Sequence, residues 1–472
     1  MNWNTFLLMR HEIVLAISII ILILADIFID DKKKVGVVAI VLFAIHTVIG
    51  FFPMETGTLF GEMFVTNPLI AAFKNILNIG VLLILMIGSS WVNAKMLPMK
   101  KVGEFYILML SSLLGMFYMI SSGHFIMLYL GLELATLPVA ALASYNVFNR
   151  KSSEAGIKLI LSAALSSGML LFGITIMYAL SGTLYFSEMA GNIGYSYLSL
   201  LGLIMVFSGM AFKISLVPFH FWTADVYEGS PTPVASYLSV ISKGAAVFIL
   251  MILLFKVFPD MKWAWTYLLY GISILTMFVG NFFALRQQNL QRFLAFSSVA
   301  QAGFIMMGFL SADSIAVSAV VYFVAIYVLS NIVIFGAVQL IGLASGKWNI
   351  DDYNGLYRTN PMISLALMVG LFSLAGIPPI SGFFGKFFLY VVAASQEYYW
   401  LIFIAVANVT VSLYYYLLVI RAAFLRQSDD PIPFFKSDIF AKIGIAVASV
   451  LLLGLGVYSP FYDYINSLSG IF

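Results

Sequence analysis

Apolar runs long enough to cross a membrane recur along the whole chain and are separated by short polar segments. A membrane-spanning helix needs about 20 consecutive, mainly apolar residues. We predict fourteen such spans, over residues 12–30, 36–52, 69–91, 104–122, 125–146, 153–180, 197–217, 232–257, 264–285, 291–310, 314–343, 361–396, 398–425 and 439–459. The pattern therefore predicts an all-α polytopic membrane protein with about fourteen transmembrane helices.

Prolines and glycines interrupt two of the predicted spans. Span 12, over 361–396, is too long for one crossing, and the segment Ile377-Pro-Pro-Ile-Ser-Gly382 divides it. Span 7, over 197–217, ends beside Pro218. Broken helices are tolerated in membranes only against protein or a water-filled cavity, and paired breaks are typical of inverted repeats. We therefore predict that helices 7 and 12 are broken, and that spans 4–8 and 9–13 are two inverted five-helix repeats.

The repeats predict four parts of the chain. They are an N-terminal three-helix segment over 1–103, a first antiporter-like repeat over 104–257, a second, inverted repeat over 258–426, and a C-terminal helix over 427–472.

Basic residues separate between alternate connections. The connections after odd-numbered spans contain Lys32, Lys33, Lys34, Lys95, Lys100, Lys101, Arg150, Lys151, Arg286, Arg292, Lys347, Arg358, Arg426, Lys436 and Lys442. The opposite connections contain only Arg10, Lys256 and Lys262. Positive charge marks the cytoplasmic side of a membrane protein. We therefore predict that both termini lie on the outer side, and the clean separation supports the number of spans.

Composition agrees with this class and excludes several others. Hydrophobic residues make up 62% of the chain and charged residues 10%, with a mean hydropathy of +1.02. Soluble domains carry about 25% charged residues. The net charge of +3 is too small to indicate a nucleic-acid partner. Cysteine is absent, which excludes disulfides and iron–sulfur clusters held by this chain, and the scattered histidines predict no metal site.

Six basic residues lie within the predicted spans, namely Lys74, Lys158, Lys213, Lys243, Lys386 and Arg421. Lys74 and Arg421 lie near span ends, from which their side chains can extend to water. The other four lie deeper or beside a break. A charge in hydrocarbon costs about 3 kcal/mol on insertion scales and is usually functional, with a structural role as the alternative.

Glu133 is the only acidic residue of its span, and Tyr129 and Thr136 share its helix face. A structural ion pair is the alternative to a functional carboxylate. Burial favours a neutral lysine, whereas a nearby carboxylate favours a charged one. Movement of Glu133 toward or away from Lys213 would therefore make the lysine hold or release a proton.

Polar residues at helical spacing recur on other spans. They are Ser162 and Ser166 after Lys158, Ser236 and Ser239 before Lys243, Ser297, Ser298 and Gln301, Tyr327 and Asn331, and Asn408 and Ser412. Each stripe alone fits helix packing. Together with the lysines they predict the lining of a buried aqueous path. His220, just past Pro218, either belongs to this path or caps the broken helix.

The longest motif resembles a known family. The segment Pro218-Phe-His-Phe-Trp-Thr-Ala-Asp-Val-Tyr-Glu-Gly-Ser-Pro-Thr-Pro-Val-Ala-Ser-Tyr-Leu-Ser-Val-Ile-Ser-Lys243 is similar to the signature of the antiporter-like membrane subunits of respiratory complex I, and among them to the N type. Gly376-Ile-Pro-Pro-Ile-Ser-Gly-Phe-Phe-Gly-Lys386 extends the resemblance. Ala224 stands where proline is common in the family, which concerns helix entry rather than chemistry. A lysine at 386 is also typical of the N type.

The resemblance implies roles for the charged residues. Glu133 and Lys213 would be an interacting pair, Lys158 and Lys243 the central relay, and Lys386 the terminal lysine of the second half-channel. The chain would be a proton-translocating subunit of an NADH-quinone oxidoreductase in the bacterial inner membrane, driven by quinone reduction elsewhere in the complex.

The same resemblance implies the surroundings of the chain. It would hold no cofactor, since redox cofactors and quinone would lie on other subunits. Its partners would be a neighbouring antiporter-like subunit, small membrane subunits and lipids. Two alternatives stay open: a subunit of a multi-subunit Na⁺/H⁺ antiporter, which shares the fold, and a scaffold with an inactive pathway, against which the cost of the buried lysines argues.

Overall fold

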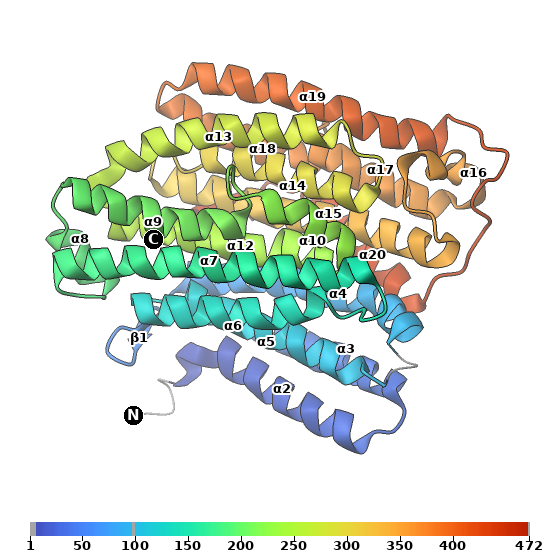
Figure 1. Ribbon diagram of the computed structural model, residues 1–472, viewed down its shortest axis with the longest axis horizontal. Helices are drawn as coiled ribbons and strands as arrows, with labels where there is room; N and C mark the ends of the chain where they lie inside the picture. Colours follow the sequence, from blue (N-terminus) through green and yellow to red (C-terminus); the bar gives the residue numbers. More distant parts are fainter. Residues whose placement is uncertain (1–5, 97–99, 471–472) are drawn as a thin grey trace.

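Helices lying side by side make up nearly the whole molecule (Figure 1). The computed structural model describes residues 6–96 and 100–470. The membrane-length helices and their continuations are α2 (Arg10–Phe28), α3 (Lys32–Gly50), α4 (Pro68–Lys95), α5 (Val102–Ile120), α6 (Phe125–Ala143), α7 (Arg150–Ser181), α9 (Tyr197–Ile214), α10 (Phe221–Gly229), α11 (Thr232–Tyr237), α12 (Lys243–Ile252), α13 (Lys262–Ala284), α14 (Leu290–Met307), α15 (Ser314–Ser345), α17 (Pro361–Ala375), α18 (Ser381–Ser395), α19 (Tyr399–Phe424) and α20 (Ile439–Gly454).

Every predicted span contains a helix, which confirms the all-helical polytopic fold. In the described part of the chain, 11 helices are long and apolar enough to cross a membrane. The remaining predicted spans correspond to α14 and to the shorter apolar helices α17, α18 and α20. Short elements that the pattern did not predict are an antiparallel hairpin of β1 (Gly57–Leu59) and β2 (Phe64–Thr66), and the helices α8 (Phe186–Asn192), α16 (Leu356–Thr359) and α21 (Pro460–Ser469).

Both predicted breaks are present. Helix α9 ends at Ile214, Ser215 takes a left-handed conformation with φ of +65°, and α10 begins at Phe221. Helix α17 ends at Ala375, and Gly376 follows with φ of +80°. Glycine adopts this conformation without steric cost, whereas serine does so at a cost. Each break leaves backbone carbonyls at a helix end inside the molecule.

Two crossings form the centre of the bundle. Helix α15 is buried from Ala316 to Gly342. Beside it runs the crossing that starts with α11 and contains two π-helical stretches, η3 (Leu238–Ser242) and η4 (Leu253–Val257), on either side of α12. π-helical stretches often lie at functional sites. Lys243 is the first residue after η3, so the irregular stretch adjoins a predicted relay lysine.

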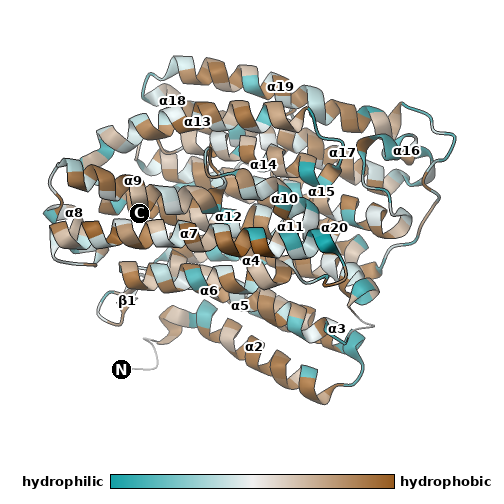
Figure 2. Cartoon of the chain, in the orientation of Figure 1, coloured by the Kyte–Doolittle hydropathy of each residue, from teal (hydrophilic) through white to brown (hydrophobic). Residues whose placement is uncertain are grey.

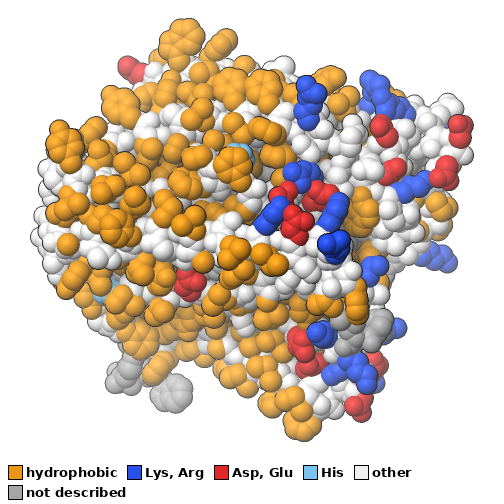
Figure 3. Space-filling view, in the orientation of Figure 1, with side chains coloured by type: hydrophobic (Ala, Val, Ile, Leu, Met, Phe, Trp, Pro, Cys, Tyr) orange, Lys and Arg blue, Asp and Glu red, His pale blue; other side chains and the backbone are white. Residues whose placement is uncertain are grey.

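Charge is distributed unevenly along the bundle. Hydrophobic residues cover the helices, and hydrophilic ones gather at one end, near α16 and the neighbouring connections (Figure 2). Figure 3 shows the same contrast on the surface, with most blue and red side chains toward that end. This end carries the connections that the sequence analysis assigned to the cytoplasm.

Candidate proton pathway

Lys213 lies in the last turn of α9, just before the first break. Its ammonium group donates a hydrogen bond to the hydroxyl of Thr136 on α6. Thr136 and Lys213 line a cavity of about 10 Å³ with Trp222 and Ser242. Such a volume holds about one water molecule. The geometry brings Lys213 next to the η3 stretch that leads to Lys243.

Glu133 lies on the outward side of α6. It is half-buried, and on its face of the helix Leu130 and Leu137 are 62% and 55% exposed. The ion pairs of the described residues do not include Glu133. The direct contact of Lys213 is Thr136, and an interaction between Glu133 and Lys213 stays a prediction.

Lys243 is 1% exposed and starts α12. Its Nζ donates to Ser298 on α14, at 2.8 Å to the hydroxyl and 3.1 Å to the carbonyl. The buried hydroxyls of Tyr227 and Tyr327 lie close to the same serine. Lys243 thus joins the first predicted repeat to a helix of the second.

Lys386 is 4% exposed and points from α18 to the second break. Its Nζ donates to the carbonyl oxygens of Leu374 at 2.7 Å and Ala375 at 3.5 Å, at the C-terminal end of α17. These carbonyls lack helical partners, and the negative end of a helix dipole favours a cation. The broken helix therefore builds the binding position of this lysine.

Side chains of α14 and α19 lead to Lys386. Ser297 contacts the hydroxyl of Tyr416 at 2.5 Å. Gln301 donates to the same hydroxyl at 3.3 Å and to the carbonyl of Leu374 at 3.2 Å. Since Lys386 donates to that carbonyl too, a series of hydrogen bonds runs to Lys386 from Ser297, which precedes the Ser298 contact of Lys243 in the sequence. Tyr416 was missed in the sequence, although it lies at helical spacing after Ser412.

Lys158 does not lie deep in the bundle, so this part of the prediction is wrong. Its side chain is 42% exposed and pairs with Glu154 at 2.6 Å and Asp225 at 2.5 Å. Asp225 and Glu228 are also held by Arg292, at 2.7 and 3.0 Å. We call these residues, together with Lys151, the charged cluster. Figure 3 shows red and blue side chains gathered over the region of α7 and α10.

The structure places the remaining predicted supporting residues, namely Ser239, Asn331, Tyr129 and His220. Ser239 and Asn331 make bonds within their own helices, to the carbonyls of Ser236 at 2.9 Å and Tyr327 at 3.0 Å, and Tyr129 is half-buried on α6. His220 is buried at the start of α10, but its side chain makes no capping hydrogen bond. A role for His220 in the path stays a prediction.

Lys74 is not exposed to water, which corrects the expectation from its place near a span end. It is 1% exposed and pairs with the equally buried Glu12 at 2.5 Å, with a further bond to Ser121 at 2.6 Å. Arg421, in contrast, lies exposed in the last turn of α19, as predicted. No local pattern in the sequence indicates that α2 supplies a partner for Lys74.

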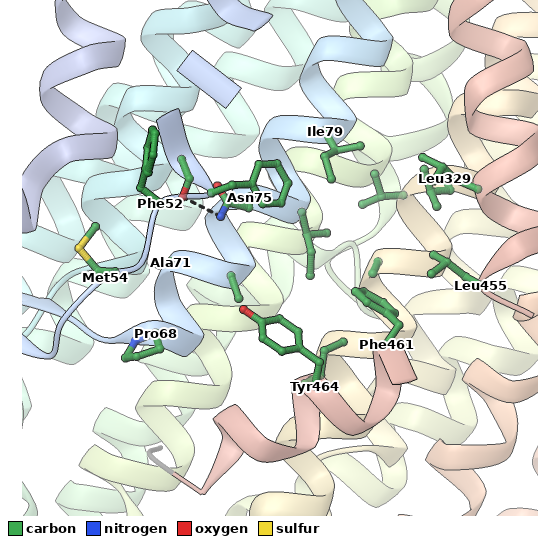
Figure 4. A pocket seen from close by; sticks show the side chains of 18 of the residues that line it. Phe52, Met54, Pro68, Ala71, Asn75, Ile79, Leu329, Leu455, Phe461 and Tyr464 are labelled. Atoms are coloured by element: carbon green, nitrogen blue, oxygen red, sulfur yellow. Dashed lines mark hydrogen bonds between the residues drawn. The ribbon is translucent and has the colours of Figure 1, made fainter. Parts of the chain in front are cut away.

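Two further features limit the chemistry that the site can perform. Among the described residues, no group of three or more His, Cys, Asp or Glu side chains is placed to hold a metal ion. A mostly apolar cavity of about 590 Å³ lies between α4, α15, α20 and α21 and includes none of the predicted relay residues (Figure 4). The predicted relay residues therefore lie outside this large cavity.

The fold and the buried lysines define an antiporter-like membrane subunit. A family model described as the transmembrane region of NADH:quinone oxidoreductase and Mrp antiporter subunits matches residues 122–412. A chain of respiratory complex I from Thermus thermophilus superposes with a TM-score of 0.81 and 29% identity, covering 95% of this chain and 97% of that one. A chain of the Mrp complex from Dietzia sp. shares the fold, with a TM-score of 0.84, 18% identity and coverage of 99% and 97%.

The similarity over the full length is more specific. The NADH-quinone oxidoreductase subunit N of Phocaeicola vulgatus is 43% identical over 469 residues, which cover 99% of both chains. The chain belongs to the NADH-quinone oxidoreductase subunit N family.

Proposed function

We propose that this chain moves protons from the cytoplasm to the exterior as a membrane subunit of an NADH-quinone oxidoreductase. Quinone reduction elsewhere in the complex drives the movement. The protons pass along Glu133, Lys158, Lys213, Lys243 and Lys386. Membership of the subunit N family supports the activity, and the contacts of the lysines support the route.

The contacts of Lys243 and Lys386 carry the proposal. Both lysines are buried, and the ion pairs of the described residues involve neither of them. Neutral oxygens hold both ammonium groups. Such a lysine can lose its proton without leaving a buried carboxylate unpaired, whereas the pair of Lys74 and Glu12 cannot. Ser297, Tyr416 and Gln301 supply hydroxyl and amide groups that lead to Lys386 from the helix that holds Lys243.

We place Lys158 at the entry of the route. Its carboxylate partners and its exposed side chain let it exchange protons with water at the basic end of the bundle. Glu133 acts on Lys213 at the next position, and Thr136 holds that lysine. Tyr327 beside Ser298, with Asn331, Ser239, Tyr129 and His220, supports the route as lining.

The two breaks support the division into two inverted repeats, over 104–257 and 258–426, with the parts at 1–103 and 427–472 added. In both halves a lysine lies beside a broken helix, Lys213 before the first break and Lys386 after the second. The gathering of basic residues at one end supports a cytoplasmic position for that end and an outer position for both termini, in a bacterial inner membrane.

The face of α6 and α7 supports a neighbouring membrane subunit. Glu133 lies half-buried among exposed leucines. Ionisable groups facing lipid directly are costly. We propose that an antiporter-like or small membrane subunit covers this face and lipids cover the rest, and that redox cofactors and quinone bind to other subunits.

Inverted membrane vesicles test the proposed activity. In vesicles whose complex carries Lys213→Ala, donor oxidation and acidification of the interior should fall together, because the lysine holds a proton between Glu133 and the η3 stretch. Assembly is checked on a native gel, and Lys347→Ala, at a partly exposed lysine outside the proposed route that pairs with Asp430 at 2.7 Å, serves as the control.

Three outcomes would reject the proposal. Unchanged oxidation and acidification in assembled Lys213→Ala complex would assign the lysine a structural role. Sodium-dependent proton movement in wild-type vesicles without an electron donor would favour the Na⁺/H⁺ antiporter, and intact pumping after loss of all the buried charges would favour a scaffold.

A further inference from the structure

The apolar cavity of about 590 Å³ lies apart from the lysine pathway and has no role in it. Its walls come from the end of α3, the first half of α4, the middle of α15, and α20 and α21 (Figure 4). Of the lining side chains in the described part of the chain, only Asn75 and Tyr464 carry a nitrogen or oxygen atom. The amide nitrogen of Asn75 donates to the carbonyl of Gly50 at 3.0 Å, and the amide oxygen is the one buried atom of these two side chains without a hydrogen-bond partner. With one such atom among apolar walls, the interior suits a hydrocarbon chain better than a polar ligand.

The depth of the cavity matches one leaflet of a membrane. Along α4 its lining runs from Pro68, at the start of the helix, to Ile79. Eleven helical steps correspond to about 17 Å, and half of the hydrocarbon core of a bilayer is about 15 Å. Its volume lies within the range of about 300–1,000 Å³ that is typical of small-molecule sites. An acyl chain entering at the end of α4 would reach the middle of the membrane.

The mouth of the cavity carries a cation and an aromatic ring. Arg10 donates to the carbonyl oxygens of Phe52 and of Pro53, both of which line the cavity. The ion pairs of the described residues do not include Arg10. Tyr464 is 54% exposed at the same end. Tyrosine is typical of the membrane interface, and a guanidinium group suits a phosphate.

We propose that this cavity binds one acyl chain of an anionic phospholipid, whose phosphate lies at Arg10. The apolar length and the single cation at its mouth together fit a molecule with a long hydrocarbon chain and one negative headgroup. Apolar packing separates the cavity side of α4 from Lys243, since Phe73 stacks on Phe248 at 4.2 Å. The site therefore does not depend on proton translocation, and either proposal can fail without the other.

Photolabelling of the whole complex tests the site. The probe is phosphatidylglycerol with a photoreactive group at the end of one acyl chain, and phosphatidylcholine with the same group is the zwitterionic comparison. In wild-type complex, phosphatidylglycerol should label the peptides that contain Ile79 and Leu329 more strongly than phosphatidylcholine does. Arg10→Gln should remove this preference, because it removes the charge and keeps the cavity.

A cavity-filling variant supplies the second arm. Ala72→Phe places a ring in the cavity and should abolish most of the labelling, whereas Ala407→Phe, at an exposed position of α19, should leave it unchanged. If the complex with Ala72→Phe does not assemble, the difference in lipid preference between wild type and Arg10→Gln decides whether the site binds an anionic phospholipid. Absence of phospholipid label from these peptides, equal labelling by both lipids in wild type, or labelling only by a photoreactive prenyl quinone would overturn the proposal.

Discussion

The buried lysines differ in how their charges are stabilised. Lys74 has a carboxylate partner in the same dry environment, whereas Lys243 and Lys386 have only neutral oxygens. A buried lysine that is paired with a carboxylate keeps its proton, because losing it would leave the carboxylate unpaired. A buried lysine among neutral acceptors can release and take up a proton. Burial alone therefore does not identify a relay residue, and the partner atoms decide between a structural and a transport role.

The pair of Lys74 and Glu12 predicts a coupled effect on stability. Lys74→Met leaves the Glu12 carboxylate buried without its partner, so the complex should lose about 3–5 kcal/mol of stability or release this subunit. Glu12→Gln combined with Lys74→Met removes both charges and should restore most of the loss. Thermal melting of the purified complex with native gels measures both, and a double variant no more stable than Lys74→Met would contradict the structural role.

At the scale of helices, close glycine contacts fix the spacing of neighbouring pairs. Gly115 of α5 packs against the backbone of Ala135 on α6, and Gly280 of α13 packs in the same way against Ala300 on α14. Small residues let membrane helices approach closely. The second contact sets the position of α14, which carries Ser297 and also Ser298, the contact of Lys243.

Two glycines on α13 offer a matched test. Gly280→Ala puts a methyl group into the backbone of Ala300 and should cost about 1–3 kcal/mol through overpacking. Gly271→Ala, on the same helix with no atom within 4 Å of the added group, should be neutral or slightly stabilising. Melting temperatures of the two variants of the complex give the comparison, and equal values would show that the close approach of α13 and α14 is not required.

The sequence predicted the helices and their breaks better than the contacts between side chains. Apolar runs located the spans, and the prolines located both breaks, because these signals are local. The positions of Lys158 and Lys74 were wrong because their partners, Asp225 and Glu12, are more than 60 residues away along the chain. Tyr416 was missed for the same reason, since its contact with Ser297 exists only after α19 packs near α14.

On the scale of the whole molecule, the proposed route would begin at the charged cluster on α7 and α10 and end at Lys386 on α18. The cluster is partly exposed, whereas Lys243 and Lys386 are buried. Both buried lysines contact residues of other helices or of a helix end, so their positions depend on how the helices pack.

The most direct test of this account is Lys243→Met, measured in inverted vesicles with donor oxidation and interior acidification recorded together. The variant keeps an apolar chain in place of the lysine and removes the contact with Ser298. With the complex assembled, we expect both rates to fall by about tenfold or more, which corresponds to about 1.4 kcal/mol or more in the barrier. Rates equal to those of the Lys347→Ala control would contradict a proton route through Lys243.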